Sequence, residues 1–102
     1  MLPLDKLEAL VRRADELDRL LCEPGVASDP TRYRKLTKER ADLETLVDSY
    51  ARYRKLKKQL DEDRAALEDP ELREMAAEEI PGLERDVDGL ERELTFLLLP
   101  PD

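Results

Sequence analysis

The sequence predicts an all-α fold, an antiparallel three-helix, coiled-coil-like bundle with a long central helix. Charged residues make up 43% of the chain and aromatic residues 4%, which is typical of long helices with thin apolar contacts. Apolar residues also recur at alternating steps of four and three, which places them on one stripe of a helix. This stripe consists of Ala76, Ile80, Leu83, Val87, Leu90, Leu94 and Leu97. At 102 residues we expect one domain, spanning 1–102.

The first helix is expected over 4–22. Glu23-Pro24-Gly25 should end it, because proline cannot continue the hydrogen-bond ladder and Gly25 tolerates a left-handed turn. Its apolar stripe is Leu7, Leu10, Ala14, Leu17 and Leu21, widened by Leu4, Val11 and Leu20.

The second helix is expected over 30–68. It begins at Asp29-Pro30, where the aspartate can cap free amides and the proline occupies the first helical position. Two series of residues spaced seven positions apart follow. The first is apolar up to Tyr50 and basic after it, and the second is apolar throughout. Since the first helix has roughly 19 residues, it should cover only the first half of the second helix. The series are Leu36, Leu43, Tyr50, Lys57 and Arg64, and Leu46, Tyr53, Leu60 and Leu67.

The third helix is expected over 70–99, beginning at Asp69-Pro70 and folding back onto the second half of the central helix. Pro81-Gly82 could divide it. An interior proline costs about 3 kcal/mol and each glycine about 1 kcal/mol. Seven stripe side chains at about 1.5–3 kcal/mol each outweigh that cost. We therefore predict one helix, kinked near 77–81.

Composition excludes several classes of protein. The chain has no Trp and no His, and so it lacks the usual proton shuttle and the commonest nitrogen ligand of metals. Its single Cys cannot form an internal disulfide, which fits a reducing cytosol. Acidic residues in 1–21 exclude a secretory signal, and the longest apolar run, 96–99, is too short to span a membrane. These features predict a soluble, cytoplasmic protein.

The net charge of −8 is unevenly distributed. Residues 1–30 carry −3, residues 31–60 carry +6 and residues 61–93 carry −10. The basic middle and the acidic final third can complement each other, which affects pairing preference more than stability. An acidic chain would repel nucleic acid at long range, so the basic middle is a poor nucleic-acid signature by itself.

Few residues suggest chemistry. Cys22 has no His to activate it, so a packing role is favoured over a reactive thiol. Tyr50 and Tyr53 could stack on bases, but both fall on apolar stripes and should be core residues. Tyr33, in Arg32-Tyr33-Arg34-Lys35, could either make surface contacts or pack against the first helix.

Charged clusters have simple interpretations too. Glu78-Glu79 and Asp61-Glu62-Asp63 should be solvated helix faces. The basic run 52–58 should face solvent, although it could also contact a partner. No catalytic, cofactor-binding or metal-ligating residue is predicted, and the chain should not be an enzyme.

Four segments together resemble the N-terminal domain of bacterial class I peptide chain release factors. The resemblance spans essentially all 102 residues. The ending is more similar to the branch of the family that reads UAA and UAG than to its sibling. The segments are Leu4–Leu10, Ser28–Leu43, Glu68–Ala76 and Leu97–Pro100.

The resemblance implies that the chain is a fragment of a larger factor. In the family, a Pro-x-Thr loop reads the codon and a Gly-Gly-Gln loop hydrolyses peptidyl-tRNA, and this sequence has neither. Implied partners are the large-subunit stalk-base protein with adjacent rRNA, and the methyltransferase that modifies the glutamine. No cofactor, membrane or small-molecule substrate is implied, and the fragment should be a monomer. Residues 100–102 look like the start of a linker, and Phe96 and Leu99 should be partly uncovered.

Two other hypotheses compete with an interaction domain of a termination factor. A free-standing helical adaptor or chaperone-like module would leave an apolar groove open and dimerise with concentration. A tRNA-contacting helical arm would need a basic face and strongly salt-dependent RNA binding, and the net charge of −8 argues against it.

Overall fold

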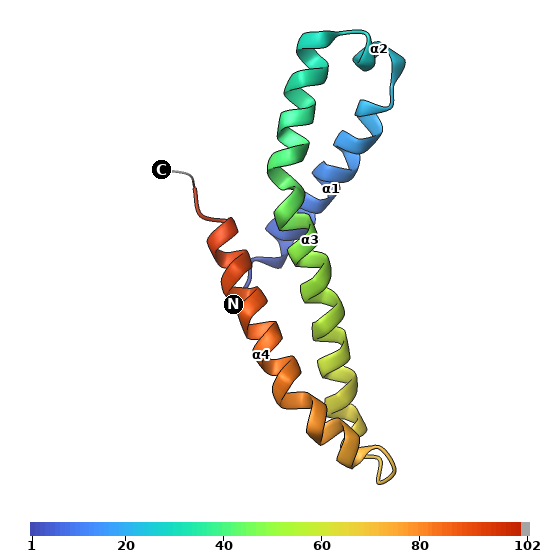
Figure 1. Cartoon of the computed structure of the whole chain (residues 1–102), viewed down its shortest axis with the longest axis vertical. Helices are drawn as coiled ribbons and strands as arrows, with labels where there is room; N and C mark the ends of the chain where they lie inside the picture. The colour runs from blue at the N-terminus through green and yellow to red at the C-terminus, as the bar shows by residue number, and fades with distance from the viewer. Residues whose placement is uncertain (101–102) are drawn as a thin grey trace. The chain divides into compact units, whose positions relative to one another are not determined.

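The computed structural model describes residues 1–100, so most of the predicted linker at 100–102 lies outside the described residues. Four helices follow one another: α1 (Leu4–Leu21), α2 (Pro24–Ala27), α3 (Pro30–Ala66) and α4 (Arg73–Leu97) (Figure 1). Residues 1–100 contain no strand, so the predicted all-α class is confirmed. The chain divides into two compact units, with the boundary between Asp48 and Ser49 inside α3.

In the first unit, α1 and the opening part of α3 run antiparallel, connected through α2 (Figure 1). Two ion pairs join these helices. Arg13 Nε lies 2.6 Å from Glu39 Oε2, and Arg40 Nε lies 2.7 Å from Asp18 Oδ1. The apolar stripe of α1 is confirmed, since its central residues are buried; Leu4 is the exception, with 49% of its surface exposed. The buried residues on α1 are Leu7, Ala14 and Leu17.

The short helix α2 was not predicted. Pro24 does end α1, but it also occupies the first position of a new helical turn, where its missing N–H costs nothing. The turn buries Val26 completely, which stabilises it. Gly25 is part of this helix, and no glycine in residues 1–100 has a positive φ, so the expected left-handed turn at Gly25 is wrong.

The predicted beginning of α3 is confirmed at Pro30. Asp29 Oδ1 accepts the Arg32 N–H at 3.2 Å, which is the expected N-cap hydrogen bond. The helix ends at Ala66 rather than at residue 68. There the Leu67 and Glu68 N–H groups bond to carbonyls three residues back, which tightens the chain into a turn.

In the second unit, α4 begins at Arg73 rather than at residue 70. The predicted start of the helix at Asp69-Pro70 is therefore wrong: Leu72 is the N-cap residue, no side chain caps the helix, and Asp69 Oδ1 instead accepts the Glu71 N–H at 2.9 Å in the preceding turn. The residues between form a turn rather than helix. The helix ends at Leu97 rather than at 99, and it continues through Pro81, so the prediction of one helix is confirmed.

The stripe predicted on α4 is also confirmed, because all of its members are buried or half-buried. Leu60 of α3 is likewise buried, and Arg64 Nη2 of α3 lies 3.0 Å from Glu84 Oε2 of α4. Phe96 and Leu99 are 73% and 60% exposed, as expected. No helix within residues 1–100 has the length and apolar character needed to cross a bilayer.

Candidate nucleic-acid interface

The first turns of α3 carry a concentration of positive charge. Residues 31–38 contain four basic side chains and no acidic one. The neighbouring carboxylate of Asp29 is engaged as the helix cap. The positive end of the helix dipole lies at the same place and adds to the attraction for anions. The basic residues are Arg32, Arg34, Lys35 and Lys38.

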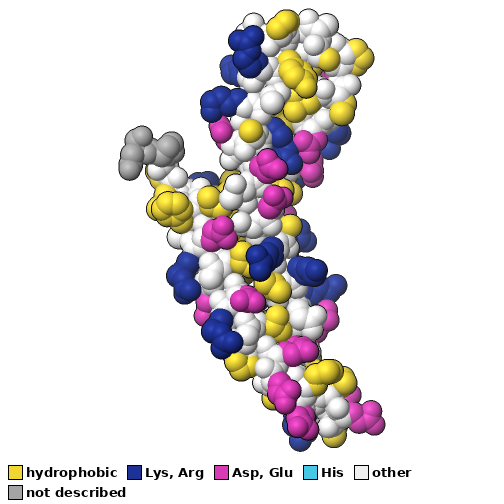
Figure 2. All heavy atoms as spheres, in the orientation of Figure 1, with side chains coloured by type: hydrophobic (Ala, Val, Ile, Leu, Met, Phe, Trp, Pro, Cys, Tyr) yellow, Lys and Arg dark blue, Asp and Glu magenta, His cyan; other side chains and the backbone are white. Residues whose placement is uncertain are grey.

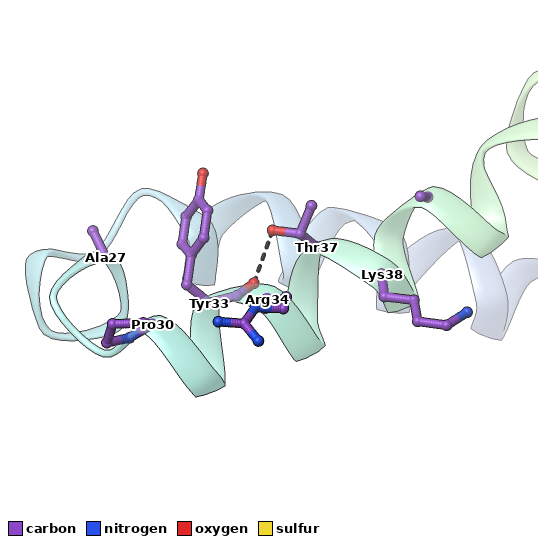
Figure 3. A pocket seen from close by; sticks show the side chains of 7 residues that line it. Ala27, Pro30, Tyr33, Arg34, Thr37 and Lys38 are labelled. Atoms are coloured by element: carbon purple, nitrogen blue, oxygen red, sulfur yellow. Dashed lines mark hydrogen bonds between the residues drawn. The ribbon is translucent and has the colours of Figure 1, made fainter.

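Tyr33 lies among these cations and is 43% exposed, so of the two predicted roles the structure favours surface contact. Figure 3 shows its ring standing away from α3 with the hydroxyl group outermost. Thr37 Oγ1 donates a hydrogen bond to the Tyr33 carbonyl at 2.8 Å. Beside the ring is an open hollow of about 580 Å³, lined by Ala27, Pro30, Tyr33, Arg34, Thr37, Lys38 and Ala41.

Electrostatic pairing differs between the faces of α3. Toward α1, the hydrogen bond from Arg13 lowers the pKa of the Glu39 carboxyl and raises that of the Arg13 guanidinium. On the outer face, Lys38 Nζ lies 3.1 Å from Asp42 Oδ2, but both side chains are largely exposed. Exposed pairs contribute only about 0–1 kcal/mol, so a phosphate can compete for Lys38. Figure 2 shows Lys and Arg side chains gathered beside hydrophobic ones at this end of the first unit.

An exposed aromatic ring with cations on either side suits single-stranded nucleic acid. Guanidinium and ammonium groups bind phosphates, and stacking of one base on an aromatic side chain contributes about 1–3 kcal/mol. Single-stranded RNA loops are recognised in this way. We therefore treat Arg32–Lys38 with its hollow as the candidate interface. The hollow was not predicted. The sequence indicated only a turn between Pro24 and Pro30.

The other two tyrosines are not available to bases, as predicted. Tyr50 is 3% exposed, and its ring stacks on that of Tyr53 with centroids 6.2 Å apart. Burial, together with the charges of Glu91 and Asp61, raises the pKa of Tyr53. The Arg54 guanidinium carbon lies 5.7 Å from the centre of the Tyr50 ring. These aromatic groups pack the second unit.

Two sequence interpretations are wrong. Cys22 was expected to pack, but it is exposed, because it follows the last residue of α1 and lies outside the apolar stripe. Asp63 was expected on a solvated face, but it is 7% exposed. Its neighbours Asp61 and Glu62 are exposed, and so are Glu78 and Glu79, as predicted.

The basic run 52–58 largely faces solvent, as predicted. Arg52, Lys55 and Lys58 are exposed, and Lys57 Nζ lies 3.5 Å from Asp61 Oδ1. Its only aromatic residue, Tyr53, is half-buried, so this run lacks an exposed aromatic ring like that of Tyr33.

The observed features define a class of protein: an all-helical chain with a cluster of exposed basic side chains at the start of α3. Within residues 1–100, no group of three or more His, Cys, Asp or Glu side chains could hold a metal ion. The family model for the PCRF domain matches residues 10–102. The chain therefore belongs to the PCRF domain family, and the resemblance to the N-terminal domain of bacterial release factor 1 is confirmed.

The curated relatives described next are each named peptide chain release factor 1. The chain is 45% identical over 102 residues to the protein of Sorangium cellulosum (strain So ce56), covering 100% of the chain and 28% of that relative. It is 48% identical over 101 residues to the protein of Anaeromyxobacter sp. (strain Fw109-5), covering 97% of the chain and 27% of the relative. It is 46% identical over 101 residues to the protein of Geobacillus kaustophilus (strain HTA426), covering 96% of the chain and 28% of that relative. The chain thus spans little more than a quarter of its relatives, and no solved structure matches it.

Proposed function

We propose that this chain is the ribosome-docking part of a translation termination factor that acts at UAA and UAG codons in the cytoplasm. The observation that carries the proposal is 45% identity over the whole chain to peptide chain release factor 1 of Sorangium cellulosum. The proposed partners are the stalk-base protein with adjacent rRNA, and the methyltransferase that modifies the factor. In this proposal the chain is not itself an enzyme; hydrolysis and codon reading belong to other parts of the factor.

The exposed surface at the start of α3 supports the rRNA part of the proposal. Tyr33 would stack on an unpaired base while Arg34 and Lys38 bind the adjacent phosphates. The net charge of −8 keeps the chain from binding RNA indiscriminately. A short basic surface on an acidic chain therefore favours docking that is guided by protein contacts as well.

The test is pulldown of large ribosomal subunits by the chain, with and without the stalk-base protein. The variant Tyr33→Leu/Arg34→Gln/Lys38→Gln should weaken capture at least tenfold and reduce its dependence on salt. The matched control is Arg12→Gln/Arg19→Gln, which removes two charges from exposed positions of α1 and should change capture less than twofold.

Two outcomes would contradict the proposal. One is equal loss of capture by both variants, which would indicate a general charge effect. The other is an unchanged rate of termination when residues 1–100 are deleted from a complete factor that contains this chain.

The alternative is an adaptor that binds client helices, and the exposure of Phe96 and Leu99 is the observation that favours it. It requires strong binding of an apolar dye and dimerisation that depends on concentration. A monomer that binds no dye and is captured by ribosomal subunits would exclude it.

A further inference from the structure

Asp63 is an ionisable side chain buried near the end of α3. Only 7% of its surface is exposed. Its Oδ1 accepts a hydrogen bond from Gln59 Nε2 at 2.8 Å, whereas no N–H or hydroxyl group donates to the buried Oδ2. A buried carboxylate oxygen without a donor is costly, so a hydrogen-bond donor or a cation at this oxygen is favoured.

A cavity of about 220 Å³ lies beside Asp63, between α3 and the beginning of α4. Glu62 and Asp63 line it from α3, and Glu79 lines it from α4. Leu72 and Met75 also line it and give it an apolar wall, with 42% and 57% of their surfaces exposed. None of the residues lining it is a Lys or an Arg. Figure 2 shows acidic side chains gathered at this end of the second unit, with hydrophobic ones beside them.

Asp63 and Glu79 act on each other across the cavity. A hydrogen bond with Asp63, followed by the repulsion of its charge, raises the pKa of the Glu79 carboxyl above its ordinary value of 4.5. Two carboxyl groups can form such a bond only when one of them carries a proton. When both are ionised, the pair leaves negative charge without a counter-ion at the cavity.

We propose that this cavity binds one basic side chain, an arginine or a lysine, from a partner protein. The cationic group would take the place of the shared proton between Asp63 and Glu79. The aliphatic stem would lie against Leu72 and Met75, as the stems of such residues do on apolar surfaces. This site belongs to the second unit and does not depend on the proposed contact of Tyr33 with rRNA.

Size and charge favour this occupant. The volume is below the roughly 300–1,000 Å³ of pockets that hold drug-sized ligands, so it suits a single side chain. A bare metal ion would need more oxygen ligands than the site offers and would gain nothing from an apolar wall. The net charge of −10 on residues 61–93 attracts a basic partner from a distance.

The test is titration of the isotope-labelled chain with the peptide acetyl-Gly-Arg-Gly-amide, followed by nuclear magnetic resonance. Chemical shifts should change at Leu72, Met75, Ala76 and Glu79. Glu79→Gln should weaken binding at least tenfold. Glu78→Gln removes the same charge from a neighbour that does not line the cavity, and it should weaken binding less than twofold. Leu72→Ser, which shortens the apolar wall, should weaken it about threefold.

The pH dependence provides a second measurement. The titratable groups that line the cavity are Glu62 and Asp63 on α3 and Glu79 on α4. Since a bound cation displaces the shared proton, affinity should rise above pH 4.5 and then level off. Equal losses from Glu79→Gln and Glu78→Gln, or equal binding of acetyl-Gly-Gln-Gly-amide, would overturn the proposal, as would shift changes confined to other regions.

Discussion

At the scale of single residues, Leu94 shows how much one apolar contact contributes to the second unit. Its side chain is fully buried on α4. We expect Leu94→Ala to lower the free energy of unfolding by about 2–5 kcal/mol, because it removes apolar contacts and leaves a cavity. Leu99→Ala is the control, since Leu99 is 60% exposed and should change stability by no more than about 0.5 kcal/mol. Urea denaturation followed by circular dichroism measures both, and similar losses would contradict the prediction.

The carboxyl pair of Asp63 and Glu79 has a consequence for stability as well as for binding. The pKa of Glu79 is raised above 4.5 in the folded chain, so the folded chain holds this proton to a higher pH than the unfolded chain does. The stability that this proton contributes is complete below about pH 4.5 and is lost as pH rises through the raised pKa.

The difference between two pH profiles isolates this effect. As pH rises above 4.5, the native chain should lose the stability that the Glu79 proton contributes. The Glu79→Gln variant should not show this loss. Glu39 has a lowered pKa and contributes the opposite slope, lost as pH falls, but it is present in both chains. Chemical denaturation at pH 4 to 8 measures the difference. Parallel profiles for the two chains would show that Glu79 does not carry the linkage.

At the scale of elements, the beginning of α3 depends on Asp29. Its carboxylate accepts the Arg32 N–H at 3.2 Å. We expect Asp29→Ala to cost about 1 kcal/mol, within the range of roughly 0.5–2 kcal/mol for loss of a capping side chain. Asp29→Asn keeps a capping oxygen and should cost a few tenths of a kcal/mol at most. Thermal and urea unfolding measure both variants. If Asp29→Asn lost as much stability as Asp29→Ala, charge rather than the hydrogen bond would stabilise this helix end.

Pro81 is the weak point of α4, because it lies in the helix interior and cannot donate to the carbonyl four residues earlier. The side chain is exposed, so replacing it removes little packing. Pro81→Ala should stabilise the chain by about 2 kcal/mol, since a gain near 3 kcal/mol is partly offset by a more flexible unfolded chain. Thermal unfolding measures the change. A fall in melting temperature would mean that the proline is needed where it is.

The elements also show where reasoning from sequence succeeds. Alternating apolar steps and the two Asp-Pro pairs are local signals, and they predicted the helices to within three residues at each end. Helix α2 was missed because four residues carry no periodicity, and burial of Val26 is what stabilises it. The burial of Asp63 depends on α4, whose Glu79 is sixteen positions away, so nothing in Asp61-Glu62-Asp63 could reveal it.

The candidate interface was only partly predictable for a related reason. The cations around Tyr33 are visible in the sequence, but the tyrosine's exposure depends on how α1, α2 and α3 meet. Charge counts over 31–60 combined this surface with the run at 52–58. The structure separates them, because only the first has an exposed aromatic ring beside a hollow.

At the scale of the whole molecule, charge is the dominant property. The net charge of −8 includes −10 on residues 61–93 alone, so like charges repel one another within the folded chain. Salt screens such repulsion, with a Debye length of about 10 Å at 0.1 M and about 3 Å at 1 M. We therefore expect the melting temperature to rise by a few degrees between 0.02 and 0.5 M sodium chloride. A falling melting temperature would show that the surface ion pairs contribute more than the repulsion costs.

The exposed thiol at the end of α1 offers a practical advantage. Because Cys22 is the only cysteine and is exposed, a maleimide dye or a nitroxide would attach at one known position without any mutagenesis. The same thiol has no intramolecular partner, so oxidised preparations would contain covalent dimers joined at that residue. Experiments that score self-association therefore need a reductant, and a fluorophore placed there would test the proposed docking of the first unit.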